Sequence, residues 1–181
     1  MSAPDAFRQQ LLAAIPRLRR YARSLVFDSP AADDLVQSAL ERALVHWRQF
    51  DPQRDLVLWL LAIAHNAWLD AIRRDRHLDV VAPERVADAL DRERRHEPDL
   101  GLQLDLAQAL SRLVADQRSA LMLVVVEQLT YAEAAEVLQV PEGTVMSRVS
   151  RARALLRGWL DGSAQMPPPA AIQRPELRRV V

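Results

Sequence analysis

The sequence predicts an all-α protein made of two small helical domains joined by a flexible linker, with a helix-turn-helix in the C-terminal domain. The 181 residues include only four glycines, and no stretch alternates between apolar and polar residues as a half-buried strand does. Apolar residues instead recur every three or four positions in two blocks. A charged segment with two prolines separates the blocks, and half of the chain is apolar. Each block is therefore expected to form a helical domain.

The first block covers residues 1–76. It opens with a helix that we expect to be interrupted or restarted at Pro16, because proline removes a backbone hydrogen bond. Ser29 and Pro30 then predict a helix start, with the serine as N-cap and the proline in the first turn. The expected inner face of that helix is formed by Leu35, Ala39 or Leu40, Ala43, Leu44 and Trp47.

A loop over residues 50–55 leads into a long helix expected over residues 56–74. Residues 77–101 are interpreted as the linker, since charges and two prolines replace the apolar periodicity there. We expect at most a short helix around residues 86–95.

The second block covers residues 102–160. Its apolar run at 121–126 has the β-branched residues of a buried strand, but helical patterns flank it and Asp116 is a candidate cap, which favours a buried helix. The tail, residues 161–181, contains three consecutive prolines and is expected to be disordered.

The helix-turn-helix is predicted from its start, its turn and its inner stripe. Thr130 and Glu133 have the spacing of a capping box, and residues 139–141 end in a proline that suits a helix start. The second helix repeats apolar residues at spacings of four, three and four, at Val145, Val149, Ala152 and Leu156. Its remaining surface carries Thr144, Ser147, Arg148, Ser150, Arg151, Arg153 and Arg157.

The charge pattern indicates what this second helix binds. The net charge is zero, yet all 24 basic residues are arginines and no acid lies between Gly143 and Leu160. Arginine can pair with guanine edges or phosphates, and serine and threonine can bond to either. The helix from Glu142 to Arg157 is therefore predicted to read double-stranded DNA. An ordinary helical hairpin with a basic, solvated face is the alternative.

Several classes of site are excluded or disfavoured. Without cysteine there are no disulfides and no thiolate metal sites, and the four histidines form no metal-ligand set. His65 is expected at the surface or half-buried, and no glycine-rich phosphate loop occurs. We expect no enzyme activity, no metal and no cofactor. No apolar run approaches the ~20 residues of a membrane span, so a cytoplasmic protein without membrane insertion is expected.

Four segments resemble bacterial extracytoplasmic-function sigma factors of the sigma-70 family. Residues 129–135 and 141–153 closely resemble region 4.2 of that family. Residues 32–37 look like region 2.2, and residues 50–74 look like regions 2.3 and 2.4. The motifs also stand in the family's order. The resemblance implies a non-catalytic subunit that binds core RNA polymerase, directs it to promoter DNA and helps to melt the −10 element.

The resemblance also implies roles for individual residues. Asp34 and Gln37 match positions that contact core polymerase. The residues implied at the −10 element are Trp59, Asn66, Asp70, Arg73 and Arg74. For Trp59, packing in the protein core is the alternative to contact with the −10 element. The residues implied at the −35 element are Thr144, Ser147, Arg148, Ser150, Arg151 and Arg153.

Two alternatives stay open at this point. A one-component helix-turn-helix regulator would leave the motifs at 33–47 and 59–74 unexplained, and it would need a dimer seam. No heptad pattern provides one, so no obligate homo-oligomer is expected. A sigma mimic that titrates an anti-sigma factor would not need DNA-reading arginines. The resemblance itself implies an anti-sigma factor as a regulatory partner.

Overall fold

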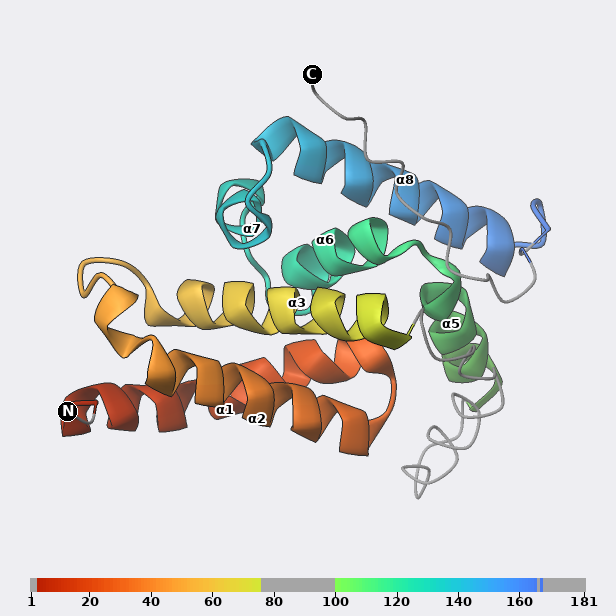
Figure 1. Cartoon of the computed structure of the whole chain (residues 1–181). Coiled ribbons are helices and arrows are strands. Elements are labelled where there is room, and N and C mark those ends of the chain that lie inside the picture. The colour runs from red at the N-terminus through yellow and green to blue at the C-terminus, as the bar shows by residue number, and fades with distance from the viewer. Residues whose placement is uncertain (1–2, 76–99, 166, 168–181) are drawn as a thin grey trace.

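The computed structural model describes residues 3–75, 100–165 and 167 (Figure 1). These residues form seven α-helices and one short 3-10 helix, with no strand among them. The all-α prediction is confirmed. The helix expected around residues 86–95 lies outside the described residues, as does most of the tail.

Helix α1 (Asp5–Val26) runs through Pro16 without a break, so the expected interruption is wrong. Proline removes one bond to the carbonyl of Leu12. Both residues are exposed, and water can satisfy that carbonyl. The helix is held instead by a buried stripe at alternating spacings of four and three: Phe7, Leu11, Ala14, Leu18, Tyr21 and Leu25.

Helix α2 (Ser29–Val45) begins one residue earlier than expected. Asp28, not Ser29, is the N-cap, and its carboxylate accepts a hydrogen bond from the amide of Ala31 at 3.0 Å. The buried face comprises Ala32, Leu35, Val36, Ala39 and Ala43. Leu44 was expected on this face but is 42% exposed.

Helix α3 (Leu56–Asp75) follows the 3-10 helix η1 (Trp47–Gln49) and the predicted loop. Contrary to the sequence expectation, residues Leu56–Arg74 are long and apolar enough to cross a membrane by length and composition. In the structure this helix packs against α1 and α2 on one side and α7 on another. Its apolar character therefore fits the central helix of a bundle.

The second half contains α5 (Leu100–Arg112), α6 (Ala115–Val125), α7 (Tyr131–Leu138) and α8 (Glu142–Leu160). The apolar run at 121–126 is helical up to Val125, as predicted. Asp116 does not cap α6, because Val114 is the N-cap and makes no side-chain capping bond. The tail begins with an ordered turn, in which the amide of Ala164 donates to the carbonyl of Gly158 at 2.9 Å.

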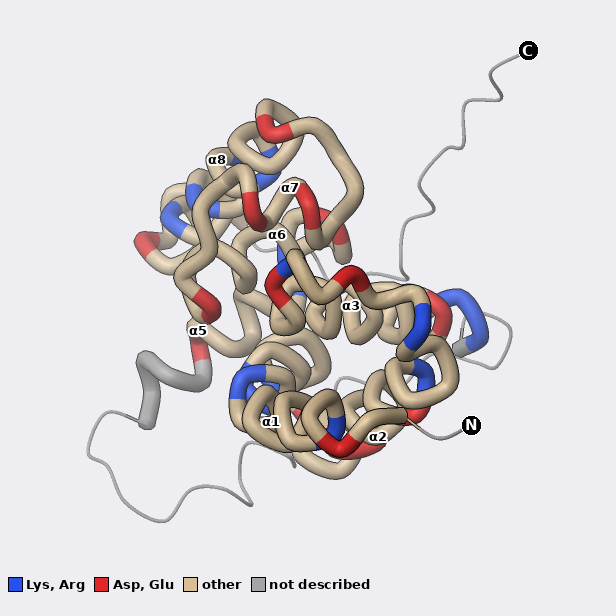
Figure 2. The backbone as a smooth tube through the Cα atoms, turned by 90° about the vertical axis from the view of Figure 1, so that its left-hand side faces the viewer, with Lys and Arg blue, Asp and Glu red and all other residues tan. Residues whose placement is uncertain are grey.

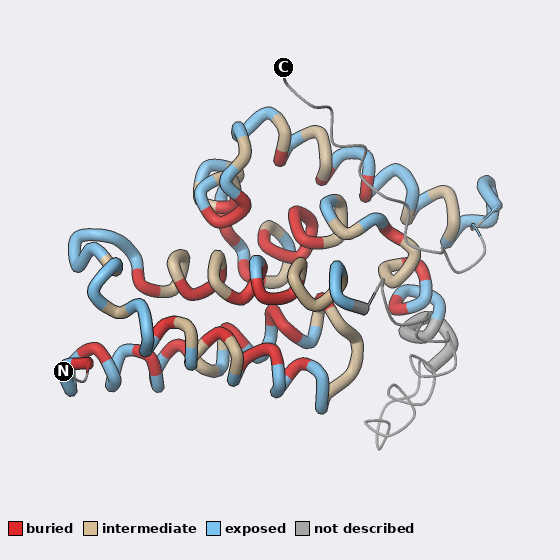
Figure 3. Tube along the Cα trace, in the orientation of Figure 1, coloured by how far each residue is buried: buried red, intermediate tan, exposed pale blue. Residues whose placement is uncertain are grey.

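The two halves pack into one continuous core. Helix α3 packs between the α1–α2 pair and α7, and α6 packs directly on α1 (Figure 1). Buried residues from both halves form a single apolar cluster, and they line the inner faces of the helices in Figure 3. The sequence predicts the two helical units but not this contact between them.

Candidate nucleic-acid interface

Residues at the two ends of α7 determine where the two helices of the helix-turn-helix begin and end. The hydroxyl of Thr130 accepts from the amide of Glu133 at 3.2 Å, and the Glu133 carboxylate accepts from the amide of Thr130 at 2.8 Å. These bonds to Thr130 lower the pKa of Glu133. Gln139 ends α7 in the left-handed conformation, with φ of 54°, and Pro141 is the N-cap of α8. The predicted capping box and turn are both confirmed.

Helix α8 is anchored along one side only. Val145, Val149 and Ala152 are buried, and Leu156 is half-buried, as the predicted stripe requires. Arginine positions recur along this helix in Figure 2, and three of them, Arg151, Arg153 and Arg157, are exposed. The outer side of α8 is therefore left accessible.

The predicted −35 residues fall into two groups. Ser150, Arg151 and Arg153 are exposed, and among the described residues neither arginine has a hydrogen-bond or ion-pair partner. The half-buried group is Thr144, Ser147 and Arg148. Arg157 is a further exposed arginine, one turn beyond Arg153, that the site prediction omitted.

Two members of the half-buried group make hydrogen bonds within the protein. The Ser147 hydroxyl donates to the carbonyl of Thr144 at 2.9 Å. Nη2 of Arg148 donates to the Asp116 carboxylate at 2.6 Å, and the Arg148 side chain is only 20% exposed. This ion pair ties α8 to α6, so in this structure Arg148 holds the helix in position and does not project outward.

The predicted −10 residues lie along α3. Trp59, Asn66 and Arg73 are spaced by seven residues, which places them along one side of the helix. Asn66 and Arg73 are exposed. Trp59 is half-buried.

The ring of Trp59 belongs to an aromatic cluster. It lies 5.3 Å from the Phe50 ring and 6.3 Å from the Phe7 ring, between ring centroids. Pairs at these distances stabilise beyond their buried area. Trp59 therefore braces the loop that precedes α3, consistent with the core role.

The C-terminal end of α3 gathers charged groups around Asp70. The Asp70 carboxylate accepts from Arg42 of α2 at 3.1 Å and from Arg73 at 3.3 Å. The guanidinium of Arg74 donates to the Asp70 carbonyl at 3.3 Å. Asp70 thus orients neighbouring arginines, and Asn66, one turn earlier, is left exposed beside them.

The two residues predicted to contact polymerase lie on the surface of α2. Asp34 and Gln37 are exposed, and the Gln37 amide donates to Glu41 at 3.0 Å. Nearby, Arg19 donates to Asp33 at 2.8 Å. This face of α2 is polar and accessible.

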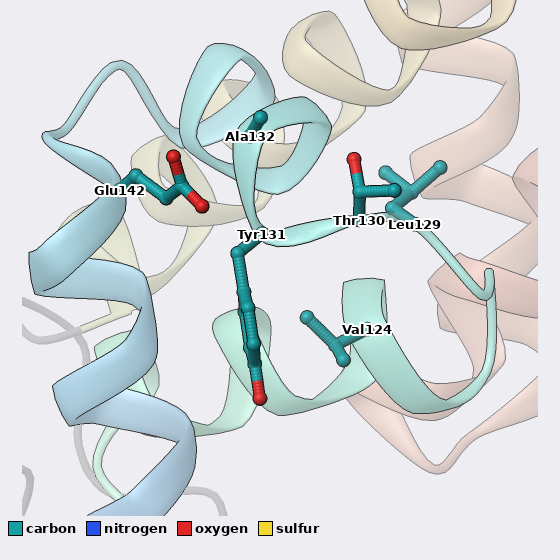
Figure 4. A pocket seen from close by; sticks show the side chains of 6 residues that line it. All are labelled: Val124, Leu129, Thr130, Tyr131, Ala132 and Glu142. Carbon is teal, nitrogen blue, oxygen red and sulfur yellow. The ribbon is translucent and has the colours of Figure 1, made fainter.

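A shallow apolar hollow opens beside the start of α7, between α6 and the first turn of α8 (Figure 4). The Tyr131 ring stands between the two helices in that view. Its lining consists of Val124, Leu129, Thr130, Tyr131, Ala132 and Glu142. The hollow lies between the capping box and the first turn of α8, and none of the predicted DNA-contact residues line it.

Sequence reasoning missed the polar groups between the two halves. Glu127 is buried and bonded to Arg17 and Arg20 of α1, while Arg118 donates to the Leu25 carbonyl. His65 was expected at the surface or half-buried, yet it is only 6% exposed. A single acid within an otherwise apolar stretch, as at Glu127, is the signal that could have indicated a buried partner.

Comparisons with known proteins agree with this geometry. Residues 12–77 match the family described as Sigma-70 region 2, and residues 103–156 match Sigma-70, region 4. The chain is 34% identical over 170 residues to the ECF RNA polymerase sigma factor EcfG of Rhodopseudomonas palustris, covering 93% of each protein. It is 35% identical over 151 residues to SigM of Mycobacterium tuberculosis, covering 83% of this chain and 75% of the relative.

Among solved structures, the chain is similar to the sigma factor RpoE of Bartonella quintana, crystallised with the anti-sigma factor NepR. The TM-score is 0.69 at 33% identity, and the match covers 87% of this chain and 98% of that one. CnrH, solved with the cytosolic domain of CnrY, matches with a TM-score of 0.64 at 27% identity, over 88% and 90% of the two chains. The chain therefore belongs to the extracytoplasmic-function RNA polymerase sigma factors of the sigma-70 family, and it acts in promoter-specific transcription initiation.

Proposed function

We propose that the two halves of this sigma factor divide promoter recognition, with α8 binding the −35 duplex and α3 binding the −10 strand as it melts. The observation that carries the proposal is the exposure of Arg151, Arg153 and Asn66. Each projects from a helix whose opposite side is buried. The division fits a chain with zero net charge, because affinity is shared between two local surfaces and the polymerase.

At the −35 element, Arg151 and Arg153 are the two predicted arginines whose side chains are exposed and can reach DNA. Arginine forks on a helix in the major groove bind guanine edges or phosphates. Ser150 is exposed between them and can bond to either. Ser147 and Thr144 then act near the N-terminus of the helix, where a phosphate oxygen is favoured.

Arg148 has a different part in this proposal. Its ion pair with Asp116 holds α8 against α6 and so fixes the angle at which α8 enters the groove. Replacing Arg148 would then weaken binding to every promoter sequence, whereas replacing Arg151 would weaken binding to some sequences more than others. Base contacts carry sequence information directly, whereas phosphate contacts do not.

At the −10 element, Asn66 is the proposed reader of a base edge. A base that leaves the stack must be held, and an exposed amide can both donate to it and accept from it. Arg73 and Arg74 hold the backbone beside it, and Asp70 keeps both arginines at the end of α3. Trp59 supports the loop before α3 by packing against Phe50.

Asp34 and Gln37 are proposed to contact core polymerase from the accessible face of α2. The chain is proposed to work in the cytoplasm, without insertion into a membrane, without a cofactor and without a catalytic site of its own. The similar Bartonella quintana sigma factor was solved with the anti-sigma factor NepR, and CnrH was solved with the cytosolic domain of CnrY. An anti-sigma factor is the corresponding partner proposed for this chain.

Run-off transcription tests the proposal. Core polymerase is combined with this chain, or left without it, on a library of templates that vary at both promoter elements. We expect transcripts only when the chain is present, and only from templates of a restricted sequence class. If no template supports initiation, the proposal fails. Template binding without initiation would instead identify a regulator that does not replace sigma.

A further inference from the structure

One long apolar side chain lies exposed on helix α8. Met146 is 50% exposed. Among the described residues it belongs neither to the apolar core nor to the lining of the hollow beside α7. A single exposed apolar residue needs no partner in general. Its neighbours on α8 therefore decide whether it has one.

Met146 lies in line with residues proposed to bind the −35 duplex. Ser150 and Arg153 follow it by four and seven residues, so these three exposed residues lie along one side of α8. The next large exposed apolar residue of this helix, Leu155, follows by nine residues, about two and a half turns, and lies on the opposite side. Met146 therefore does not belong to a row of apolar residues such as a helix carries when it docks into an apolar groove.

The residues next to Met146 on the outer side of α8 are small. Gly143 precedes it by three residues, and a Cβ atom added there would meet nothing within 4 Å. Ser147 and Ser150 follow it within about one turn. Small residues let a helix backbone approach a ligand closely, and the major groove of B-DNA admits an α-helix. The longer Met146 side chain is then within reach of base edges.

The chemistry of methionine limits what Met146 can recognise there. Its thioether sulfur is only a weak acceptor, and the side chain has no donor. It therefore cannot read the hydrogen-bonding edges of guanine, cytosine or adenine as arginine or asparagine does. Thymine is different, because it presents an apolar C5-methyl group in the major groove.

We propose that Met146 determines part of the −35 specificity by selecting a thymine through contact with its C5-methyl group. The inference rests on the proposed function, in which α8 binds the −35 duplex. Removing one methyl-sized apolar group from water changes affinity roughly fourfold. The contact is therefore smaller than a bidentate arginine contact, and it adds to the contacts proposed for Arg151 and Arg153.

Uracil tests the contact, because it keeps the base pair of thymine and lacks only the methyl group. The promoter selected in the run-off library is remade with each −35 thymine, on either strand, changed singly to deoxyuridine. Binding of the complete holoenzyme to each template is then titrated. We expect one position at which uracil weakens binding by the parent roughly fourfold.

Variants at Met146 identify the side chain that senses the methyl group. Met146→Gln keeps the length and helix propensity of methionine but has a polar end, so it should bind the thymine and uracil templates equally. Met146→Leu remains apolar and should retain most of the parent's preference. Leu155→Gln makes the same kind of change on the opposite side of α8 and should retain the full preference.

Cytosine supplies the converse measurement. When cytosine replaces the contacted thymine, 5-methylcytosine restores the methyl group without changing the hydrogen-bonding edge. Methylation should raise binding by the parent roughly fourfold and leave binding by Met146→Gln unchanged.

Several results would overturn the inference. The parent could show no sensitivity to uracil, Met146→Gln could show the same sensitivity as the parent, or the selected −35 element could contain no A·T pair. Any of these, in a holoenzyme that still selects a −35 sequence, would refute the role of Met146 and leave the proposed function standing. Absence of initiation on every template would refute the proposed function, and the role of Met146 with it.

Discussion

His65 gives the sharpest prediction about pH. Its ring is 6% exposed, its Nδ1 lies 3.4 Å from the Tyr21 hydroxyl, and it packs against the Trp68 ring. Burial lowers the pKa of His65 from its usual 6.5 to about 4. Asp116 opposes this shift and Arg148 adds to it, both more weakly than burial. The histidine is therefore neutral in the folded protein at physiological pH.

The direction of the effect follows from the two states of the chain. Above pH 6.5 His65 is neutral whether the chain is folded or unfolded, and it contributes no pH dependence. Between pH 6.5 and 4 only the unfolded chain binds the proton, so the free energy of unfolding falls as pH falls. From the two pKa values the loss between pH 8 and pH 5 is roughly 2 kcal/mol. For a chain of this size that is about 4–8 °C in Tm.

Urea unfolding followed by circular dichroism at pH 8 and pH 5 measures this loss. The same pair of measurements on His65→Gln is the control, because glutamine is neutral at both pH values and the carboxylates are unchanged. The unfolding free energy of the parent chain should fall by roughly 2 kcal/mol more than that of the variant. Equal losses in the two proteins would refute the buried, neutral histidine.

Three further predictions concern helix starts and the polymerase contact. Thr130→Ala should cost about 1 kcal/mol of unfolding free energy by removing the acceptor for the third amide of α7, and Thr130→Ser should restore most of it. Asp28→Ala should cost a similar ~1 kcal/mol of unfolding free energy at the start of α2, and Asp28→Asn should stay close to the parent. Urea titration measures both predictions. If an alanine variant is as stable as the matching Thr130→Ser or Asp28→Asn variant, the capping role is contradicted. Alanine at both Asp34 and Gln37 should weaken binding to core polymerase on the order of tenfold in a fluorescence titration, without changing stability, whereas Asp5→Ala should not weaken it.

Local features were predictable from the sequence because they depend on residues that are only a few positions apart in the chain. The capping box at Thr130 and the buried stripe through Val145 and Val149 depend on residues within a turn or two of one another. Pro16 misled the prediction because a single lost hydrogen bond at an exposed position is outweighed by a buried stripe along the whole of α1. The cap of α2 moved by one residue because aspartate and serine stand side by side and either can cap.

Contacts across the chain were not predictable in this way. Arg148 has the sequence signature of a DNA-reading residue, yet it pairs with Asp116, 32 residues away. Glu127 meets Arg17 and Arg20 only because α1 and α6 lie together in the folded chain. No local periodicity encodes which charged residue finds a distant partner. The exposed polar residues proposed to contact DNA on α8 and α3 were recognisable, whereas the groups that hold those helices in place were not.

The central claim, that α8 and α3 act at different promoter elements, is tested most directly by crossing two variants with a two-element promoter library. Initiation is measured by run-off for the parent chain, Asn66→Ala and Arg151→Ala. Arg8→Ala is the control, because it removes an exposed arginine that belongs to neither proposed surface. Arg151→Ala should change base preference only within the −35 element, by ~1–3 kcal/mol at the contacted position. Asn66→Ala should change preference only within the −10 element. Both variants altering the same element, or both losing activity equally on every template, would contradict the account.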